Sequence, residues 1–269
     1  MLAHPTTRFT HPTTRFTHPT TRFSSRVANY VRFRPAYPPA VVELLARHAG
    51  LTPDSVIADI GSGTGLLGSA FLHQGHTVIG VEPNREMREA GDTLLARYPS
   101  FRSLAARAEA TTLPDGAIDL IVAGQAFHWF DVPETRREWL RILKPNHLAA
   151  LIWNERDPEA TAFMRETEAL IDTCAAALDP DGTIREGGRS RIPALFAPSP
   201  VYLNEFPNTQ HLDLEGLLGR VASCSYIPHE TDPQYPEMSA ELARIFDRHQ
   251  QNGRVTLHYR TKVYWAPLT

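Results

Sequence analysis

The chain has 269 residues, 42% of them apolar, and a formal net charge of −3 at pH 7. A chain of this size can bury one substantial core, and its apolar runs are shorter than the roughly eighteen residues that a membrane span needs. Cys174 and Cys224 lie far apart, without His or Cys at metal-ligand spacing, so the sequence indicates neither disulfides nor a metal site and favours a cytoplasmic location.

The N-terminal part differs from the rest in charge and pattern. Residues 1–42 contain six arginines and no acidic residue, which leaves a formal charge of −9 on residues 43–269. This acidic body argues against nucleic acid as a partner. A seven-residue unit with one Pro and one Phe occurs three times within residues 1–24, which we expect to be a disordered tail. A transit segment, or weak metal binding by His4, His11 and His18, stays open.

Residues 25–269 are predicted to form one domain that starts with alternating helices and strands. Short β-branched runs separated by amphipathic segments indicate parallel βαβ units with helices on both faces of a sheet. Within a core of residues 38–155, helices are expected at 38–48, 66–74, 84–98 and 134–143, and strands at 56–60, 77–81, 118–123 and 148–153.

The alternation ends after Asn154. A helix at 159–178 and a Gly- and Arg-rich loop at 182–190 are expected within an insertion of about residues 156–198. We interpret this insertion as a lid above the carboxyl ends of the strands, where open α/β sheets bind ligands. Residues 199–269 are expected to add a strand at 201–206, a helix at 238–250 and an alternating strand at 255–264.

A glycine-rich loop follows the first predicted strand. Gly61, Gly63 and Gly65 alternate there before a helix, a pattern that lets backbone approach a ligand closely. Residues 63–68 also match the G-x-G-x-x-G pattern of NAD(P)-dependent oxidoreductases. The acidic Asp59 argues against this alternative, because it would repel a pyrophosphate, whereas it can accept a hydrogen bond from a cationic amine.

Glu82 ends the second predicted strand, about twenty residues beyond the glycine loop. Its carboxylate can accept hydrogen bonds from both hydroxyls of a ribose. Because NAD uses the same arrangement, Glu82 indicates an adenosine-type ligand without identifying it.

Four motifs in this order resemble class I S-adenosylmethionine-dependent methyltransferases. They are residues 59–65, 81–83, 107–121 and 140–145. The resemblance implies a Rossmann-like three-layer α/β sandwich, with a mostly parallel seven-stranded sheet whose last strand is antiparallel. It also implies S-adenosyl-L-methionine as cofactor, bound by Asp59, Gly61, Ser62, Gly63, Gly65, Glu82, Pro83, Ala108, Glu109 and Gln125.

Residues 23–38 and 125–130 resemble a small-molecule branch of that family, which includes trans-aconitate and quinone-pathway methyltransferases. The acceptor implied is a carboxylic acid, a phenol or a quinone precursor. Tyr30 and Arg34 lie four residues apart and are expected at the cofactor, where the arginine would hold a carboxylate of either the cofactor or the acceptor.

Three further residues are candidates for the acceptor pocket. His128 follows the fourth predicted strand and is the candidate general base, which matters only for a hydroxyl or a protonated amine acceptor. Trp129 and Phe130 are expected to form an aromatic wall near the sulfonium. A catalytically silent binding module with the same fold also stays open, and the sequence leaves the oligomeric state undetermined.

Overall fold

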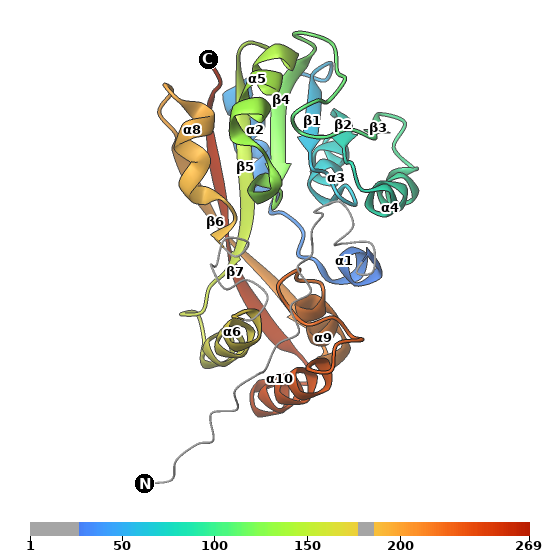
Figure 1. The fold of residues 1–269 in the computed structure, drawn as a ribbon, viewed down its shortest axis with the longest axis vertical. Helices are drawn as coiled ribbons and strands as arrows, with labels where there is room; N and C mark the ends of the chain where they lie inside the picture. Colours follow the sequence, from blue (N-terminus) through green and yellow to red (C-terminus); the bar gives the residue numbers. More distant parts are fainter. Residues whose placement is uncertain (1–26, 177–185) are drawn as a thin grey trace.

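The computed structural model of the protein describes residues 27–176 and 186–269 (Figure 1). The predicted tail and the first residues of the predicted Gly- and Arg-rich loop lie outside these ranges. Seven strands form one sheet: β1 (Val56–Ile60), β2 (Thr77–Val81), β3 (Phe101–Leu104), β4 (Ile118–Gly124), β5 (Leu143–Arg156), β6 (Tyr202–Leu212) and β7 (Val255–Pro267).

The order of the strands across the sheet is β3-β2-β1-β4-β5-β7-β6. β1 pairs in parallel with β2 and β4, and the parallel pairing continues to β3 on one side and β5 on the other. β7 is antiparallel to both β5 and β6. The predicted fold class is therefore confirmed, including the antiparallel last strand.

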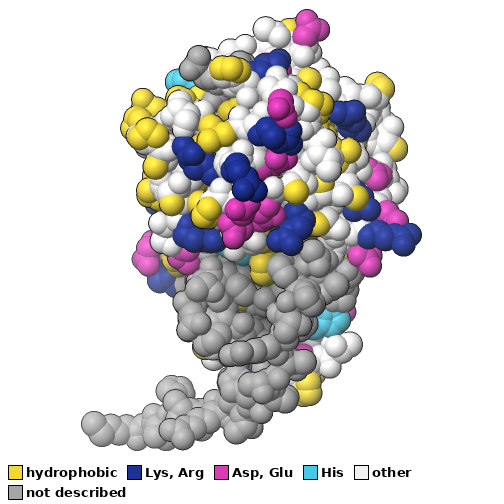
Figure 2. All heavy atoms as spheres, turned by 45° about the horizontal axis from the view of Figure 1, so that its top comes forward, with side chains coloured by type: hydrophobic (Ala, Val, Ile, Leu, Met, Phe, Trp, Pro, Cys, Tyr) yellow, Lys and Arg dark blue, Asp and Glu magenta, His cyan; other side chains and the backbone are white. Residues whose placement is uncertain are grey.

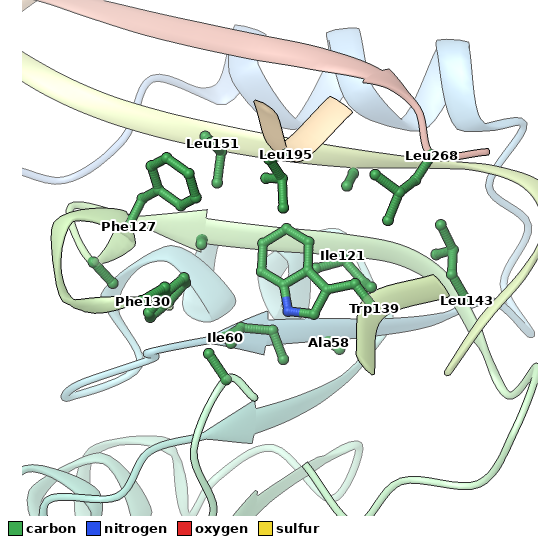
Figure 3. Close-up of a cluster of buried hydrophobic side chains, with 14 of the residues drawn as sticks. Ala58, Ile60, Ile121, Phe127, Phe130, Trp139, Leu143, Leu151, Leu195 and Leu268 are labelled. Carbon is green, nitrogen blue, oxygen red and sulfur yellow. The ribbon is translucent and has the colours of Figure 1, made fainter. Parts of the chain in front are cut away.

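Helices cover both faces of the sheet. On one face, α2 (Pro39–Ala49) and α3 (Leu66–His73) pack over the central strands, joined by Leu95 of α4 (Arg85–Leu95). On the other face lie α5 (Val132–Ile142) and α8 (Ile192–Phe196), which follows the short turn η4 (Arg189–Arg191). The fully buried indole of Trp139 lies at the centre of this second core, between the sheet and Leu195 (Figure 3).

A separate helical layer packs around the C-terminal end of β6 and the N-terminal end of β7 (Figure 1). It consists of α6 (Ala162–Ala175), α9 (Leu214–Ala222) and α10 (Tyr235–His249), which share a third apolar cluster with β7. The insertion expected at residues 156–198 is thus divided, because α6 joins this layer whereas α8 packs on the sheet beside α5. The physical reason is that α8 carries Ile192, Leu195 and Phe196, which bury against the α5 core.

Helix α1 (Val27–Phe33) connects the two parts of the molecule through its contacts with α9 and α4. Its packing explains a glycine inside α9, since a Cβ atom at Gly219 would lie 2.2 Å from the Phe33 ring. Beyond Phe33, the chain is held against β5, where the Asn154 side chain donates to the carbonyls of Pro35 and Ala36 at 3.3 and 3.4 Å.

The outer face turned toward the viewer in Figure 2 carries positive and negative side chains close together. Ion pairs of the protein include Arg141 with Asp115 and Lys144 with Asp119. Over residues 27–176 and 186–269, no helix is long and apolar enough to cross a membrane.

Candidate functional site

The glycine loop between β1 and α3 makes a close turn under the segment that follows β4. Gly61 has a φ of +69°, and its amide donates to the Val81 carbonyl at 2.8 Å. A Cβ atom added at Gly61 would lie 2.6 Å from Cβ of Ala126. A larger residue would therefore push the β1 and β4 loops apart, so glycine is required here by the approach of two backbones as well as by the positive φ.

Glu82 connects this loop to β2. Its Oε2 accepts from the Gly63 amide at 2.9 Å, and its Oε1 accepts from the Asn84 amide at 2.7 Å. Burial raises the pKa of the carboxyl above its ordinary value, and the two amide donors counteract part of that rise. Each oxygen of a carboxylate retains a further acceptor position, so Glu82 remains able to take hydroxyl donors.

A cavity of about 240 Å³ opens in front of Glu82, at the carboxyl ends of β1, β2 and β4. Most of the residues expected at the cofactor or along the aromatic wall line it: Tyr30, Gly61, Gly63, Glu82, Pro83, Ala108, Glu109, Gln125, Trp129 and Phe130. Five lining residues were not predicted: Asn84, Met87, Arg107, Gly124 and Ala126. Met87 had a usable signal, because it is the first apolar residue of the helix after Glu82.

Four expected cofactor residues do not line this cavity: Arg34, Asp59, Ser62 and Gly65. Asp59 lies behind the loop, 1% exposed, where its Oδ2 accepts from the Gly68 amide at 2.9 Å. Burial raises the pKa of Asp59 to about 7 despite that hydrogen bond. The Ser62 amide donates a hydrogen bond to the Val81 carbonyl, so Asp59 and Ser62 shape the loop from behind. Contact of these two residues with a cofactor stays a prediction.

A second cavity of about 260 Å³ adjoins the first, and both are lined by Tyr30 and Gln125. Gln125 has a φ of +59°, and its side chain donates to the Asn154 carbonyl at 3.2 Å. A non-glycine residue held in this conformation at the end of a strand is typical of functional sites. Gln125 thus stands between the two cavities.

The second cavity carries more arginines than carboxylates. Arg34, Arg156, Arg189 and Arg220 line it together with Glu155 and Glu168. Arg156 is paired with Glu168 through two hydrogen bonds of 2.5 and 3.1 Å. Such a surface favours an anionic ligand.

Arg34 retains donor capacity at this cavity. Its guanidinium lies over the Tyr30 ring, 4.7 Å from the centroid, and its Nη2 donates to the Ser223 carbonyl at 2.8 Å. Its Nε has no hydrogen-bond partner among the described residues. The structure therefore places Arg34 at the second cavity and not at the first, and which of the two carboxylates it would hold stays a prediction.

His128 and Trp129 face different cavities. Both belong to the short turn η3 (Phe127–Trp129), with ring centroids 4.6 Å apart, yet His128 lines the second cavity and Trp129 the first. Arg191 holds the turn by donating to the carbonyls of Phe130 and Phe127 at 3.0 and 3.3 Å. Within the described ranges, no group of His, Cys, Asp or Glu is arranged to hold a metal ion.

The sequence is similar to those of known methyltransferases. Residues 58–151 match a methyltransferase domain. The chain is 33% identical over 202 residues to an uncharacterized methyltransferase of Mycobacterium tuberculosis, covering 75% of this chain and 76% of that protein. It is 29% identical over 249 residues to an uncharacterized methyltransferase of Schizosaccharomyces pombe, covering 88% and 93%.

The fold comparison agrees. A putative type II methyltransferase from Anaeromyxobacter dehalogenans superposes with a TM-score of 0.63 at 21% identity, covering 88% of this chain and 98% of that one. A putative methyltransferase of an antibiotic biosynthesis pathway from Anabaena variabilis gives a TM-score of 0.54 at 20% identity, covering 86% and 98%. At these identities the two structures support the fold alone.

Proposed function

The chain belongs to the class I S-adenosylmethionine-dependent methyltransferases, and from this premise we propose that it methylates a small carboxylic acid held in the second cavity. One observation carries the proposal: an arginine-rich cavity adjoins the cofactor cavity at Tyr30 and Gln125. S-adenosylmethionine supplies a methyl group on a sulfonium, which an acceptor takes by in-line displacement.

The residues of the first cavity fit an adenosine-containing cofactor. Glu82 offers acceptor positions for the ribose hydroxyls, and the Gly61–Gly63 backbone leaves the space that side chains would fill. Ala108 and Glu109 line the same cavity from the loop after β3. Glu109 is fixed there because its Oε1 accepts from the Asp131 amide at 3.0 Å.

The acceptor side needs orientation and exclusion of water more than proton transfer. A carboxylate attacks in its ionised form, so the task of the protein is to hold it in line with the methyl group. The guanidinium of Arg34 lines the second cavity and can hold a carboxylate there, and Gln125 can orient it between the cavities. In this proposal His128 shapes the pocket, whereas a phenol acceptor would need it as a base.

The proposal predicts which acceptors are methylated. Small mono-, di- and tricarboxylic acids should incorporate label from methyl-labelled cofactor, whereas the matching primary amides should not. Arg34→Leu should raise the KM for the acid at least tenfold with little change in the affinity for S-adenosylhomocysteine, because a charge-assisted hydrogen bond contributes about 1.5 to 3 kcal/mol. Arg32→Leu is the matched control, since Arg32 lies two residues earlier, at the end of α1, but pairs with Glu215 in solvent.

The pH dependence separates acid from phenol acceptors. For a carboxylate, kcat of wild type and of His128→Gln should lack an ascending limb near the imidazole pKa. Methylation of phenols but not of acids, with such a limb lost in His128→Gln, would reject the carboxylic acid and restore His128 as the base.

A further inference from the structure

The wall of the second cavity buries more positive than negative charge. The Arg156 side chain is 11% exposed and Arg220 is 3% exposed, and Arg34 approaches the same region through the Ser223 carbonyl. Glu168 neutralises the charge of Arg156, with which it forms two hydrogen bonds, but does not bond to Arg220. A buried guanidinium without a negative partner is costly, so the second buried arginine needs an explanation.

Arg220 contacts no carboxylate in residues 27–176 and 186–269. Its Nε donates to the Tyr259 hydroxyl at 3.1 Å, and its Nη1 lies 3.1 Å from Sγ of Cys224 and 3.4 Å from Oγ of Ser223. Nη1 of Arg156 also approaches the same sulfur, at 3.9 Å. Two guanidinium groups from different elements, α9 and β5, thus converge on one sulfur atom.

Cys224 lies just beyond the end of α9, 1% exposed, and directly precedes Ser225 and Tyr226, which line the second cavity. We propose that Cys224 is a thiolate in the folded protein and the counter-ion of Arg156 and Arg220, so that its charge limits how strongly the second cavity attracts anions. That Cys224 is ionised is inferred from the surrounding charges. That its charge affects binding of an acceptor rests on the proposed function.

The electrostatic surroundings of the sulfur support this assignment. Burial by itself raises the pKa of the Cys224 thiol, but the positive charges of Arg220, Arg34 and Arg156 and a hydrogen bond from Tyr226 outweigh it and lower the pKa below its ordinary value. Glu168 faces the group from α6 through Arg156, and Tyr259 faces it from β7 through Arg220.

Cys174 provides a contrast within the same chain. It lies on α6, where burial and the nearby Glu237 raise the pKa of its thiol to about 11. The two thiols should therefore ionise far apart on the pH scale, with Cys224 first. Thiolate absorbance near 240 nm reports this order directly.

The first experiment is a spectroscopic titration of the unliganded full-length protein, so it does not depend on any methyl transfer. The variant Cys174→Ser should show one thiolate step below the pH at which an ordinary thiol ionises, about 8.5. Cys224→Ser should lack that step and keep the high-pH one. If Cys174→Ser forms no thiolate below about pH 8, the proposal is overturned, even if the protein proves to be an active methyltransferase.

The second experiment measures how the sulfur charge acts through the arginines, with inorganic sulfate as the probe by calorimetry at pH 7.5. Cys224→Ser removes a negative charge beside two guanidiniums, so it should bind sulfate at least threefold more tightly than wild type. Cys224→Asp should restore the wild-type affinity. A serine variant that binds sulfate no more tightly than wild type, or that equals the aspartate variant, overturns the counter-ion role.

The pH dependence of sulfate binding adds a readout that a purely structural role would not change. In wild type, sulfate affinity should rise as pH falls and the thiolate is protonated, because the cavity then becomes more positive. Cys224→Ser should lack this component. His128 lines the same cavity in both proteins, so whatever it contributes cancels in the comparison.

Discussion

Asp59 illustrates how a single buried carboxyl group affects stability. It is 1% exposed, and only its Oδ2 has a hydrogen-bond partner in the part of the chain that the structure describes. Burial raises the pKa to about 7, from an ordinary value of 3.8. Because the folded state binds the proton more tightly than the unfolded state, Asp59 favours folding at low pH and opposes it as the pH rises from about 4 through 7.

We therefore predict that Asp59→Asn removes this pH dependence. The stability of the variant relative to wild type should increase by about 2 to 3 kcal/mol between pH 5 and pH 8, since one pKa unit corresponds to about 1.4 kcal/mol. Urea unfolding at the two pH values measures the difference. A stability difference that is the same at both would show that Asp59 is ionised throughout this range.

At this scale, residues on the strand-to-loop motifs could be predicted from sequence, because Gly61, Gly63 and Glu82 are fixed by local order along the chain. Arg34 was predicted near a carboxylate, but its cavity depends on α9 and on Ser223 directly after it, whose carbonyl accepts from Arg34. Arg220 and Cys224 could not be predicted. Their meeting with Arg156 depends on the tertiary packing of α9 against β5 and β7.

Among the elements, α5 anchors the loop that lines the first cavity. Glu138 of α5 accepts from the amide and hydroxyl of Thr111 at 2.7 and 2.5 Å and from Nη2 of Arg141 at 2.8 Å. Thr111 closely follows Ala108 and Glu109 of the first cavity. Burial tends to raise the pKa of Glu138, but hydrogen bonds from Arg141 and Thr111 prevail and lower it to about 2.

The low pKa gives a second prediction with the opposite sign. Ionised Glu138 contributes stability above its ordinary pKa of 4.5, and this contribution disappears as pH falls through about 2. Glu138→Gln should lose about 2 to 3 kcal/mol at pH 7 and less than half of that at pH 3. Urea unfolding tests it, with exposed Glu134→Gln on the same helix as the control. An equal loss at both pH values would contradict the low pKa.

Element prediction succeeded where burial and periodicity were strong. Strands β1, β2 and β4 are buried on both faces and appear as apolar runs. Strand β3 was not predicted, because it is a four-residue edge strand with only partial burial. Helix α9 was also missed, since Gly216 and Gly219 lower its helix propensity, although Asp213 caps it and Phe33 packs on it.

At the scale of the whole molecule, the second cavity lies between the sheet and the helical layer of α6, α9 and α10. β6 and β7 run from the sheet into the helical layer (Figure 1). The second cavity takes Gln125 and His128 from the sheet side and Glu168 and Arg220 from α6 and α9. A ligand bound in this cavity contacts both parts. Binding should therefore stabilise the folded state as a whole.

The last prediction uses the coupling between ligand binding and stability to test Glu82. S-adenosylhomocysteine at a hundredfold excess over its Kd should stabilise the protein by about 2.7 kcal/mol, which raises Tm by roughly 5 to 10 °C for a chain of this size. Glu82→Ala removes the proposed acceptor for the ribose hydroxyls and should abolish most of this shift at the same ligand concentration. The shift, not Tm itself, is compared, because Glu82 also holds the Gly63 and Asn84 amides. Glu89→Ala, which removes a solvent-exposed partner of Arg85, should keep the full shift. An undiminished shift in Glu82→Ala would place the ribose elsewhere in the cavity and leave Glu82 as the residue that shapes the glycine loop.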